Sequence, residues 1–196
     1  MLFEKRKLEK LINHVRLGKS ILLLDFFKSS ANLKNISRQG WIDRLSIIHP
    51  ESVADHTFSM AIIGMVLSDS KNYDTEKILK MILLHDLAES VTGDITPEKK
   101  TKNEKIILEN KIMKDILANL PKSLQIQYLK IWEEYQENKS SDAKFVHQVD
   151  KFEMALQAKF YQKQTSFEKT KVFFETAKDE ITDPSLLKFL EQVCTK

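Results

Sequence analysis

The sequence predicts an all-α protein. Glycine and proline number only four each among 196 residues, so few positions interrupt a regular helix. Apolar residues recur at spacings of three and four over long segments, which is the period of an amphipathic helix. The length suits one compact domain, and 42% hydrophobic with 30% charged residues is ordinary for a globular chain. We therefore expect a single helical domain over residues 1–196.

Local start and stop signals place the first helices. One helix is expected over about residues 3–30, followed by an irregular, polar passage. Ser52 is a suitable cap for the next helix, because Asp55 stands three residues later in the capping-box position. A further helix is expected over about 75–91, ending before Gly93.

The second half of the chain opens with another start signal. Thr96 is followed by Pro97 and Glu98, and threonine caps a helix while proline fits its first turn. The remaining helices are expected near residues 98–119, 122–138, 141–164 and 166–179, with a short one after Pro184.

Composition and charge narrow the cellular setting. Lys and Arg total 31 against 28 Asp and Glu, so the net charge of +3 is a small difference between dispersed populations. The most hydrophobic stretch, residues 21–27, is far shorter than the roughly 20 residues that a membrane helix needs. Cys194 is the only cysteine, which excludes an intrachain disulfide and favours a reducing compartment. We expect a cytoplasmic protein that binds neither nucleic acid nor membrane.

Four ionisable residues fall in or beside one apolar segment, LLHDLAESVTGD at residues 83–94. On a helix, Glu89 is four residues from His85 and three from Asp86, so all three can project toward one side. Burying several carboxylates without partners is very costly, and a metal ion removes that cost. Adjacent helical residues diverge by about 100°, so His85 and Asp86 would hold a metal from either side, and further ligands must come from elsewhere.

Two residues elsewhere are candidate ligands. His56 lies inside the apolar helix VADHTFSMAIIGMV, and Asp150 lies beside the apolar stripe of FVHQVDKFEMALQA. Taken alone, each is more readily a core or boundary residue. Together with the adjacent pair His85 and Asp86, they form a set that is harder to explain by core packing alone.

This set resembles the HD-domain metal-dependent phosphohydrolases, which are named after such a histidine and aspartate pair. Longer blocks are similar to the 5′-deoxynucleotidase branch of that family. These blocks are PESVADHTFSMA at 50–61, LLHDLAESVTGDITP at 83–97, QVDKFEMALQAKFY at 148–161 and, upstream, LLDFFKSSANLKNISRQGW at 23–41. The resemblance covers about residues 21–165 and leaves helical extensions at both ends of one HD domain.

The resemblance implies a helical bundle that holds one divalent metal through His56, His85, Asp86 and Asp150. Such a mixed nitrogen and oxygen site suits manganese, cobalt, iron, zinc or magnesium. Two carboxylates cancel the charge of a dication, so bound water is less acidic than at an all-histidine zinc site, and a helper base becomes useful. The resemblance assigns proton transfer to Glu89, and the alternative is a hydrogen bond that orients a ligand histidine.

The resemblance also indicates substrate contacts. Asp94 faces the sugar in similar deoxynucleotidases, whereas the turn TGD alone predicts a capping aspartate. Arg38 and Arg44 are candidates to bind phosphate, and Trp41 to pack against a nucleoside, with a core or dimer anchor as the alternative for Trp41. Bacterial members carry an arginine directly before the tryptophan, and Gly40 stands in that place here.

The implied activity is hydrolysis of 2′-deoxyribonucleoside 5′-monophosphates by a homodimer. One alternative is another HD-type activity, such as a nucleotide phosphodiesterase or an alarmone hydrolase. Alarmone hydrolases typically carry HDxxED, whereas this chain reads HDLAES. The other alternative is a helical interaction protein stabilised by metal, against which Glu89 and Asp94 count, because a purely structural site would not require them.

Overall fold

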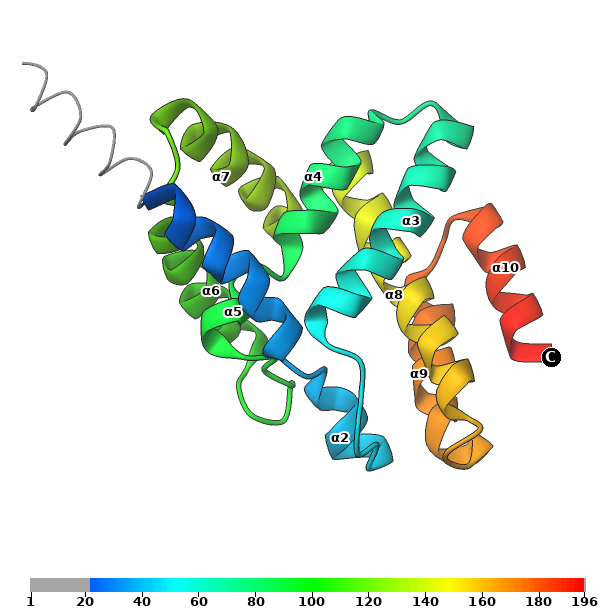
Figure 1. Cartoon of the computed structure of the whole chain (residues 1–196). Helices are drawn as coiled ribbons and strands as arrows, with labels where there is room; N and C mark the ends of the chain where they lie inside the picture. The colour runs from blue at the N-terminus through cyan, green and yellow to red at the C-terminus, as the bar shows by residue number, and fades with distance from the viewer. Residues whose placement is uncertain (1–21, 196) are drawn as a thin grey trace, which may run out of the picture.

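The computed structural model describes residues 22–195, which form a bundle of helices (Figure 1). Within these residues there is no strand, and the one sheet-like pairing is an antiparallel bridge between Ser37 and Ser52. None of the described helices combines the length and apolar character that a bilayer crossing requires. Residues 22–32 are helical, while the rest of the helix expected over 3–30 lies outside the described residues. The all-α prediction is confirmed.

The further elements follow in chain order. They are η1 (Leu33–Asn35), α2 (Gln39–Leu45), α3 (Val53–Lys71), α4 (Thr75–His85), α5 (Glu89–Thr92), α6 (Lys102–Leu117), α7 (Lys122–Glu137), α8 (Ser141–Tyr161), α9 (Phe167–Glu180) and α10 (Pro184–Thr195). The helices expected from residue 122 onward agree with α7 to α10 to within a few residues.

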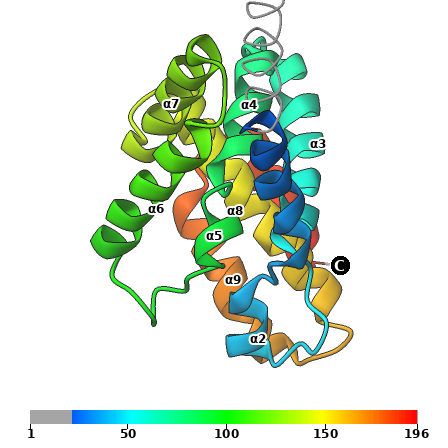
Figure 2. The same cartoon turned by 60° about the vertical axis from the view of Figure 1, so that its left-hand side comes forward.

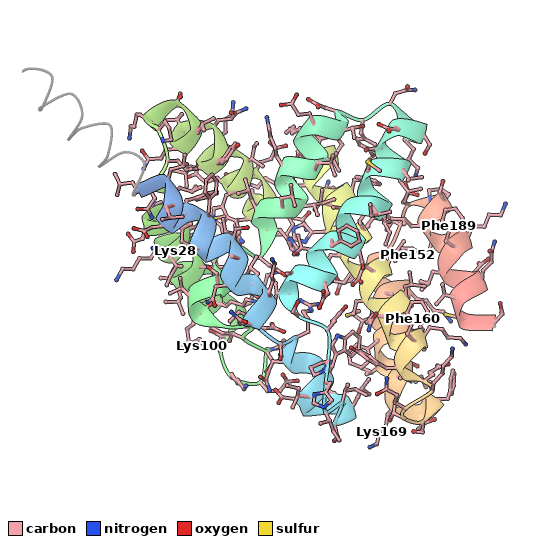
Figure 3. The ribbon with its side chains drawn as sticks, viewed as in Figure 1. Lys28, Lys100, Phe152, Phe160, Lys169 and Phe189 are labelled. Carbon is pink, nitrogen blue, oxygen red and sulfur yellow. The ribbon has the colours of Figure 1, made fainter. Side chains whose placement is uncertain are left out.

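Helix α8 is the centre of the bundle. It packs against α3, α4, α7, α9 and α10, and Figure 2 shows it in the middle of the molecule, with α6 and α7 on one side and α3 on the other. Phe145, Val149 and Phe152 recur at helical spacing and are all buried. The ring of Phe152 lies 6.3 Å from that of Phe189 in α10 (Figure 3). This apolar stripe fixes the rotation of α8 and hence the direction of the polar residues beside it.

Helix α3 begins with the predicted capping box. The Ser52 hydroxyl accepts a hydrogen bond from the backbone N–H of Asp55, and the Asp55 carboxylate accepts one from the backbone N–H of Ser52. Such a cap stabilises a helix by about 1 kcal/mol. The carbonyl of Ser52 also accepts from the backbone N–H of His56, so the cap places His56 in the first turn.

The single helix expected over 75–91 is a wrong prediction, because the chain breaks after His85. Asp86 has φ −112° and ψ 12°, outside the helical region. The next N–H groups donate three residues back, from Leu87 to Leu84 and from Glu89 to Asp86. This tight turn separates α4 from α5 and changes the direction in which consecutive side chains project.

Two further boundaries differ from expectation. Thr96, Pro97 and Glu98 do not start a helix: they form a turn, and α6 begins at Lys102 after its own capping box from Thr101 and Glu104. The passage before residue 52, expected to be irregular, contains the two-turn helix α2. The backbone N–H of Gln39, at the start of α2, donates to the carboxylate of Asp94. The group that binds the first N–H of this helix lies 55 residues away in sequence, so the residues next to α2 do not predict where it begins.

Candidate metal centre

Four side chains from three parts of the bundle converge at one point. His56 comes from α3, His85 and Asp86 from the end of α4 and the turn after it, and Asp150 from α8. The Nε2 atom of His56 lies 3.3 Å from Asp150 Oδ1 and 3.9 Å from Asp86 Oδ2, and His85 Nε2 lies 3.0 Å from that same Asp86 oxygen. The structure therefore brings the four predicted ligands together.

Three of the converging atoms are buried and have no hydrogen-bond partner. They are Nε2 of His56, Nε2 of His85 and Oδ2 of Asp86. Buried polar atoms in native proteins are nearly always paired, so a cluster of unpaired ones calls for a bound group. One donor atom of each of these residues lies within 4.8 Å of the others. The donor set is two imidazole nitrogens and carboxylate oxygens, which fits a divalent transition-metal ion.

Hydrogen bonds orient both imidazole rings. His85 Nδ1 lies 2.6 Å from the carbonyl oxygen of Ile82. Because a carbonyl only accepts, Nδ1 carries the proton and the lone pair of Nε2 points to the cluster. His56 Nδ1 lies 2.5 Å from Oε2 of Glu153, a carboxylate that is only 2% exposed. Glu153 was not among the predicted site residues, although its place three residues after Asp150 puts both on one side of α8.

The acidic groups favour a positive charge at the cluster. Burial lowers the pKa of His56, but hydrogen bonds to Asp150 and Glu153 outweigh burial and raise that pKa to about 10. Burial raises the pKa of Asp150, yet the charge of Lys151 and the contact with His56 bring it well below its usual value. The carboxylates of Asp150 and Glu153 that favour a proton on His56 would equally favour a metal cation bound at its Nε2.

Glu89 stands beside the cluster as a buried acid with one free oxygen. Glu89 is the first residue of α5 and is 1% exposed. Its Oε1 accepts a hydrogen bond from Nζ of Lys105 at 3.0 Å, and its Oε2 is buried without a hydrogen-bond partner. Burial raises the pKa of Glu89 well above its usual range, the charge of Asp86 raises it further, and Lys105 opposes both. Lys105 lies on α6 and was not predicted from the sequence. This environment suits a group that exchanges a proton.

Arg38 and Asp94 also lie at the cluster. Nη1 of Arg38 is 3.6 Å from Asp86 Oδ2. Burial lowers the pKa of Arg38, but the nearby carboxylates, chiefly Asp86 and Asp94, outweigh burial and raise it. Asp94 accepts from the backbone N–H of Gln39 at 2.8 Å, and so ties the segment after α5 to the start of α2. The guanidinium of Arg38 is therefore held next to the predicted ligands.

Trp41 and Arg44 occupy different surroundings. Trp41 is 2% exposed, lies against the rings of Tyr161 and Phe173, and donates its indole N–H to Glu51 at 2.8 Å. Arg44 is paired with Glu98 at 2.7 Å and lies over the ring of Phe173. These contacts are those of a core residue and of a surface ion pair. The substrate contacts expected of both side chains stay predictions.

Comparisons with known proteins agree with this geometry. A family model of the HD domain matches residues 30–187. The chain is 39% identical to 5′-deoxynucleotidase HDDC2 of Dictyostelium discoideum over 82% of this chain and 90% of that protein. It is 37% identical to 5′-deoxynucleotidase hdd1 of Schizosaccharomyces pombe over 90% of both.

Solved structures show the same architecture. A protein of Pyrococcus horikoshii superimposes with a TM-score of 0.72 at 30% identity, over 87% of this chain and 97% of that one. A conserved hypothetical protein of Pyrococcus furiosus gives a TM-score of 0.71 at 27% identity, over 88% and 99%. Fold, family match and the cluster around the adjacent pair His85 and Asp86 therefore agree. The chain belongs to the HD-domain family of metal-dependent phosphohydrolases, in the branch that includes these 5′-deoxynucleotidases.

Proposed function

We propose that this protein is a metal-dependent 5′-deoxynucleotidase, which hydrolyses 2′-deoxyribonucleoside 5′-monophosphates to a nucleoside and inorganic phosphate. The observation that carries the proposal is the convergence of unpaired donor atoms of His56, His85 and Asp86 beside Glu89 and Arg38. The names of the relatives support the choice of substrate class.

His56, His85, Asp86 and Asp150 would hold one divalent cation, which is manganese, cobalt, iron, zinc or magnesium in this proposal. When bound, the ion supplies Lewis-acid polarisation of a phosphate oxygen and acidifies water. Because Asp86 and Asp150 are anionic, they balance the charge of the cation in a buried place. The two histidines contribute through Nε2, since their Nδ1 atoms are engaged with Glu153 and with the carbonyl of Ile82.

The remaining site residues would handle substrate and proton. The guanidinium of Arg38 presents forked donors that suit the phosphate oxygens. Glu89 takes a proton from the attacking water through its free oxygen as the new bond to phosphorus forms. The bond between phosphorus and O5′ then breaks, and the leaving oxygen receives a proton to become the nucleoside hydroxyl. Asp94 is proposed to face the sugar.

The assembly and setting complete the proposal. One HD domain spans residues 1–196, and it acts as a cytoplasmic homodimer on a free nucleotide rather than on nucleic acid. The family match over residues 30–187 supports one domain, and the dispersed charge gives no cationic field for nucleic acid.

Two measurements test the proposed function. Elemental analysis of the purified protein should find one divalent ion per chain, and the quadruple exchange of the four ligands to alanine should remove it. Phosphate release from a panel of deoxyribo- and ribonucleoside monophosphates, assayed with each candidate metal, should favour the deoxy substrates. Equal rates for both sugars would refute the deoxynucleotidase assignment, and bound metal without any phosphate release would refute the enzyme assignment.

A further inference from the structure

A buried carboxylate, Glu153, and a half-buried one, Glu51, lie close to the His56 ring, and Glu153 contacts Nδ1 rather than the predicted ligand atom. Glu153 is 2% exposed and makes the 2.5 Å contact with His56 Nδ1. Glu51, in the segment before α3, has a carboxylate oxygen within 4.8 Å of both Glu153 and His56 donor atoms. Neither glutamate belongs to the four predicted ligands, and the proposed mechanism gives no step to either.

Glu51 is held by bonds from three directions. Its carboxylate accepts from the indole N–H of Trp41 at 2.8 Å. Its backbone N–H donates to the hydroxyl of Tyr161 at 2.8 Å, and its carbonyl accepts from the backbone N–H of Arg38 at 3.0 Å. The backbone of Glu51 is therefore fixed relative to α8 and to the segment that carries Arg38, and its carboxylate is fixed relative to α2.

The short contact between Glu153 and His56 fixes the orientation of the imidazole ring. With a carboxylate oxygen 2.5 Å from Nδ1, that nitrogen carries the proton of the hydrogen bond, and the lone pair of Nε2 is left available on the side of Asp86 and Asp150. Glu51 has a carboxylate oxygen within 4.8 Å of this contact and accepts a hydrogen bond from Trp41, so it limits how far the Glu153 carboxylate and the His56 ring can shift.

We propose that Glu153 and Glu51 are positioning residues, which hold the His56 imidazole in its ligand orientation and couple α2, through Trp41, to the metal centre. This inference rests on the proposed metal site but not on the identity of the substrate. This inference also gives Trp41 a different role. Its indole N–H would position the metal ligand His56 through Glu51 and Glu153, whereas the sequence predicted that Trp41 packs against a nucleoside.

The test is Co²⁺ binding by metal-free protein, measured by calorimetry together with the visible absorption of the bound ion. Glu153→Gln keeps an oxygen that can accept from Nδ1 but removes the charge, whereas Glu153→Leu removes the acceptor. We expect Co²⁺ affinity to fall about 10-fold for the first and about 100-fold for the second, the range seen when partners of ligand histidines are removed. Thermal unfolding in chelator identifies any loss that is due to folding alone.

Matched controls separate positioning from general packing. Glu134→Gln removes another carboxylate that bridges two helices, through Lys77 of α4, and should leave Co²⁺ affinity unchanged. Trp41→Phe removes the N–H bond to Glu51 and should weaken Co²⁺ binding. Trp132→Phe removes an equally buried indole N–H bond, to Asn110, and should not.

Several outcomes decide the matter. Wild-type affinity in both Glu153 variants, or equal losses in the variants of Trp41 and Trp132, would overturn the inference. If a Glu153 variant does not fold, Glu51→Gln carries the same expectation of weakened Co²⁺ binding, and unchanged binding there overturns it. Wild-type protein that binds Co²⁺ but releases no phosphate would refute the proposed function while leaving this inference standing. Wild-type protein that binds no Co²⁺ would refute both.

Discussion

At the scale of single residues, the charged side chains around Glu89 and Arg38 set the pKa of each group. Burial and the neighbouring charge of Asp86 both raise the pKa of Glu89. The charge of Lys105 offsets part of that rise. Arg38 lies among carboxylates that keep it cationic. One side chain can therefore exchange a proton while the other holds a permanent charge. These are the two properties that phosphate ester hydrolysis needs from groups next to a metal.

Glu89→Gln should retain bound metal and lose most turnover. The amide keeps the shape of the side chain but removes the ionisable oxygen, so general base catalysis worth about 10²- to 10⁴-fold is lost. Phosphate release at saturating deoxynucleotide measures the loss, and elemental analysis confirms the metal content. Turnover equal to that of wild type would make Glu89 an orienting residue instead.

Arg38→Lys should raise KM for the deoxynucleotide and lower kcat/KM by about 10- to 100-fold, since a charge-assisted hydrogen bond contributes about 1.5 to 3 kcal/mol. Lysine keeps the charge but loses the forked geometry that suits phosphate. Arg44→Lys is the matched control, because Arg44 is engaged with Glu98 and Phe173. A larger effect at Arg44 than at Arg38 would assign the phosphate contact to Arg44.

At the scale of elements, the end of α4 decides how the site is built. In a continuous helix, His85 and Asp86 would diverge by about 100°. The turn after His85 instead brings His85 Nε2 to 3.0 Å from Asp86 Oδ2. Glu89 is the first residue of a separate short helix, α5. Two neighbouring residues can thus face one ion while a third remains free for proton transfer.

The sequence predicted the parts of this site that have a local or familiar pattern. The cap formed by Ser52 and Asp55 depends on residues three apart, and it was found. The break at Asp86 was missed, because no glycine or proline marks it. Glu153 and Lys105 were missed because their roles depend on partners in other helices, His56 and Glu89. Burial and pairing across helices are properties of the tertiary fold, which spacing along one helix does not reveal.

Lys105 of α6 should set the pH dependence of the reaction. Its charge lowers a Glu89 pKa that burial has raised, so Lys105→Met should raise this pKa further. The carboxylate is the active form of a base, so less of it is present at low pH and the acidic limb of kcat/KM should move to higher pH. Lys105→Arg should keep the wild-type profile, and so should Lys102→Met, an exposed lysine of the same helix. An acidic limb that does not move in Lys105→Met would separate Lys105 from catalysis.

At the scale of the whole molecule, the site is complete only when distant segments meet. Its proposed ligands come from α3, the end of α4 and α8, and its other groups from α5, α6 and the segment before α2.

The outer face of α3 carries exposed apolar residues. Phe58, Ile62 and Val66 follow one another at intervals of four residues and are 68%, 46% and 56% exposed. Single exposed apolar residues are ordinary, but an aligned stripe is typical of a protein interface.

The predicted homodimer should use this stripe of α3. An isologous interface needs one self-complementary patch, and a helix stripe packed against its own copy provides one. Light scattering after size exclusion should give twice the chain mass of 22.8 kDa for wild type. The double variant Phe58→Glu with Val66→Glu should give the monomer mass, because it would bury like charges at the contact, and it should still bind Co²⁺. Ile48→Glu changes a residue that is 85% exposed and lies outside α3, so it should remain dimeric. A monomeric wild type would refute the dimer, and a dimeric double variant would move the interface away from α3.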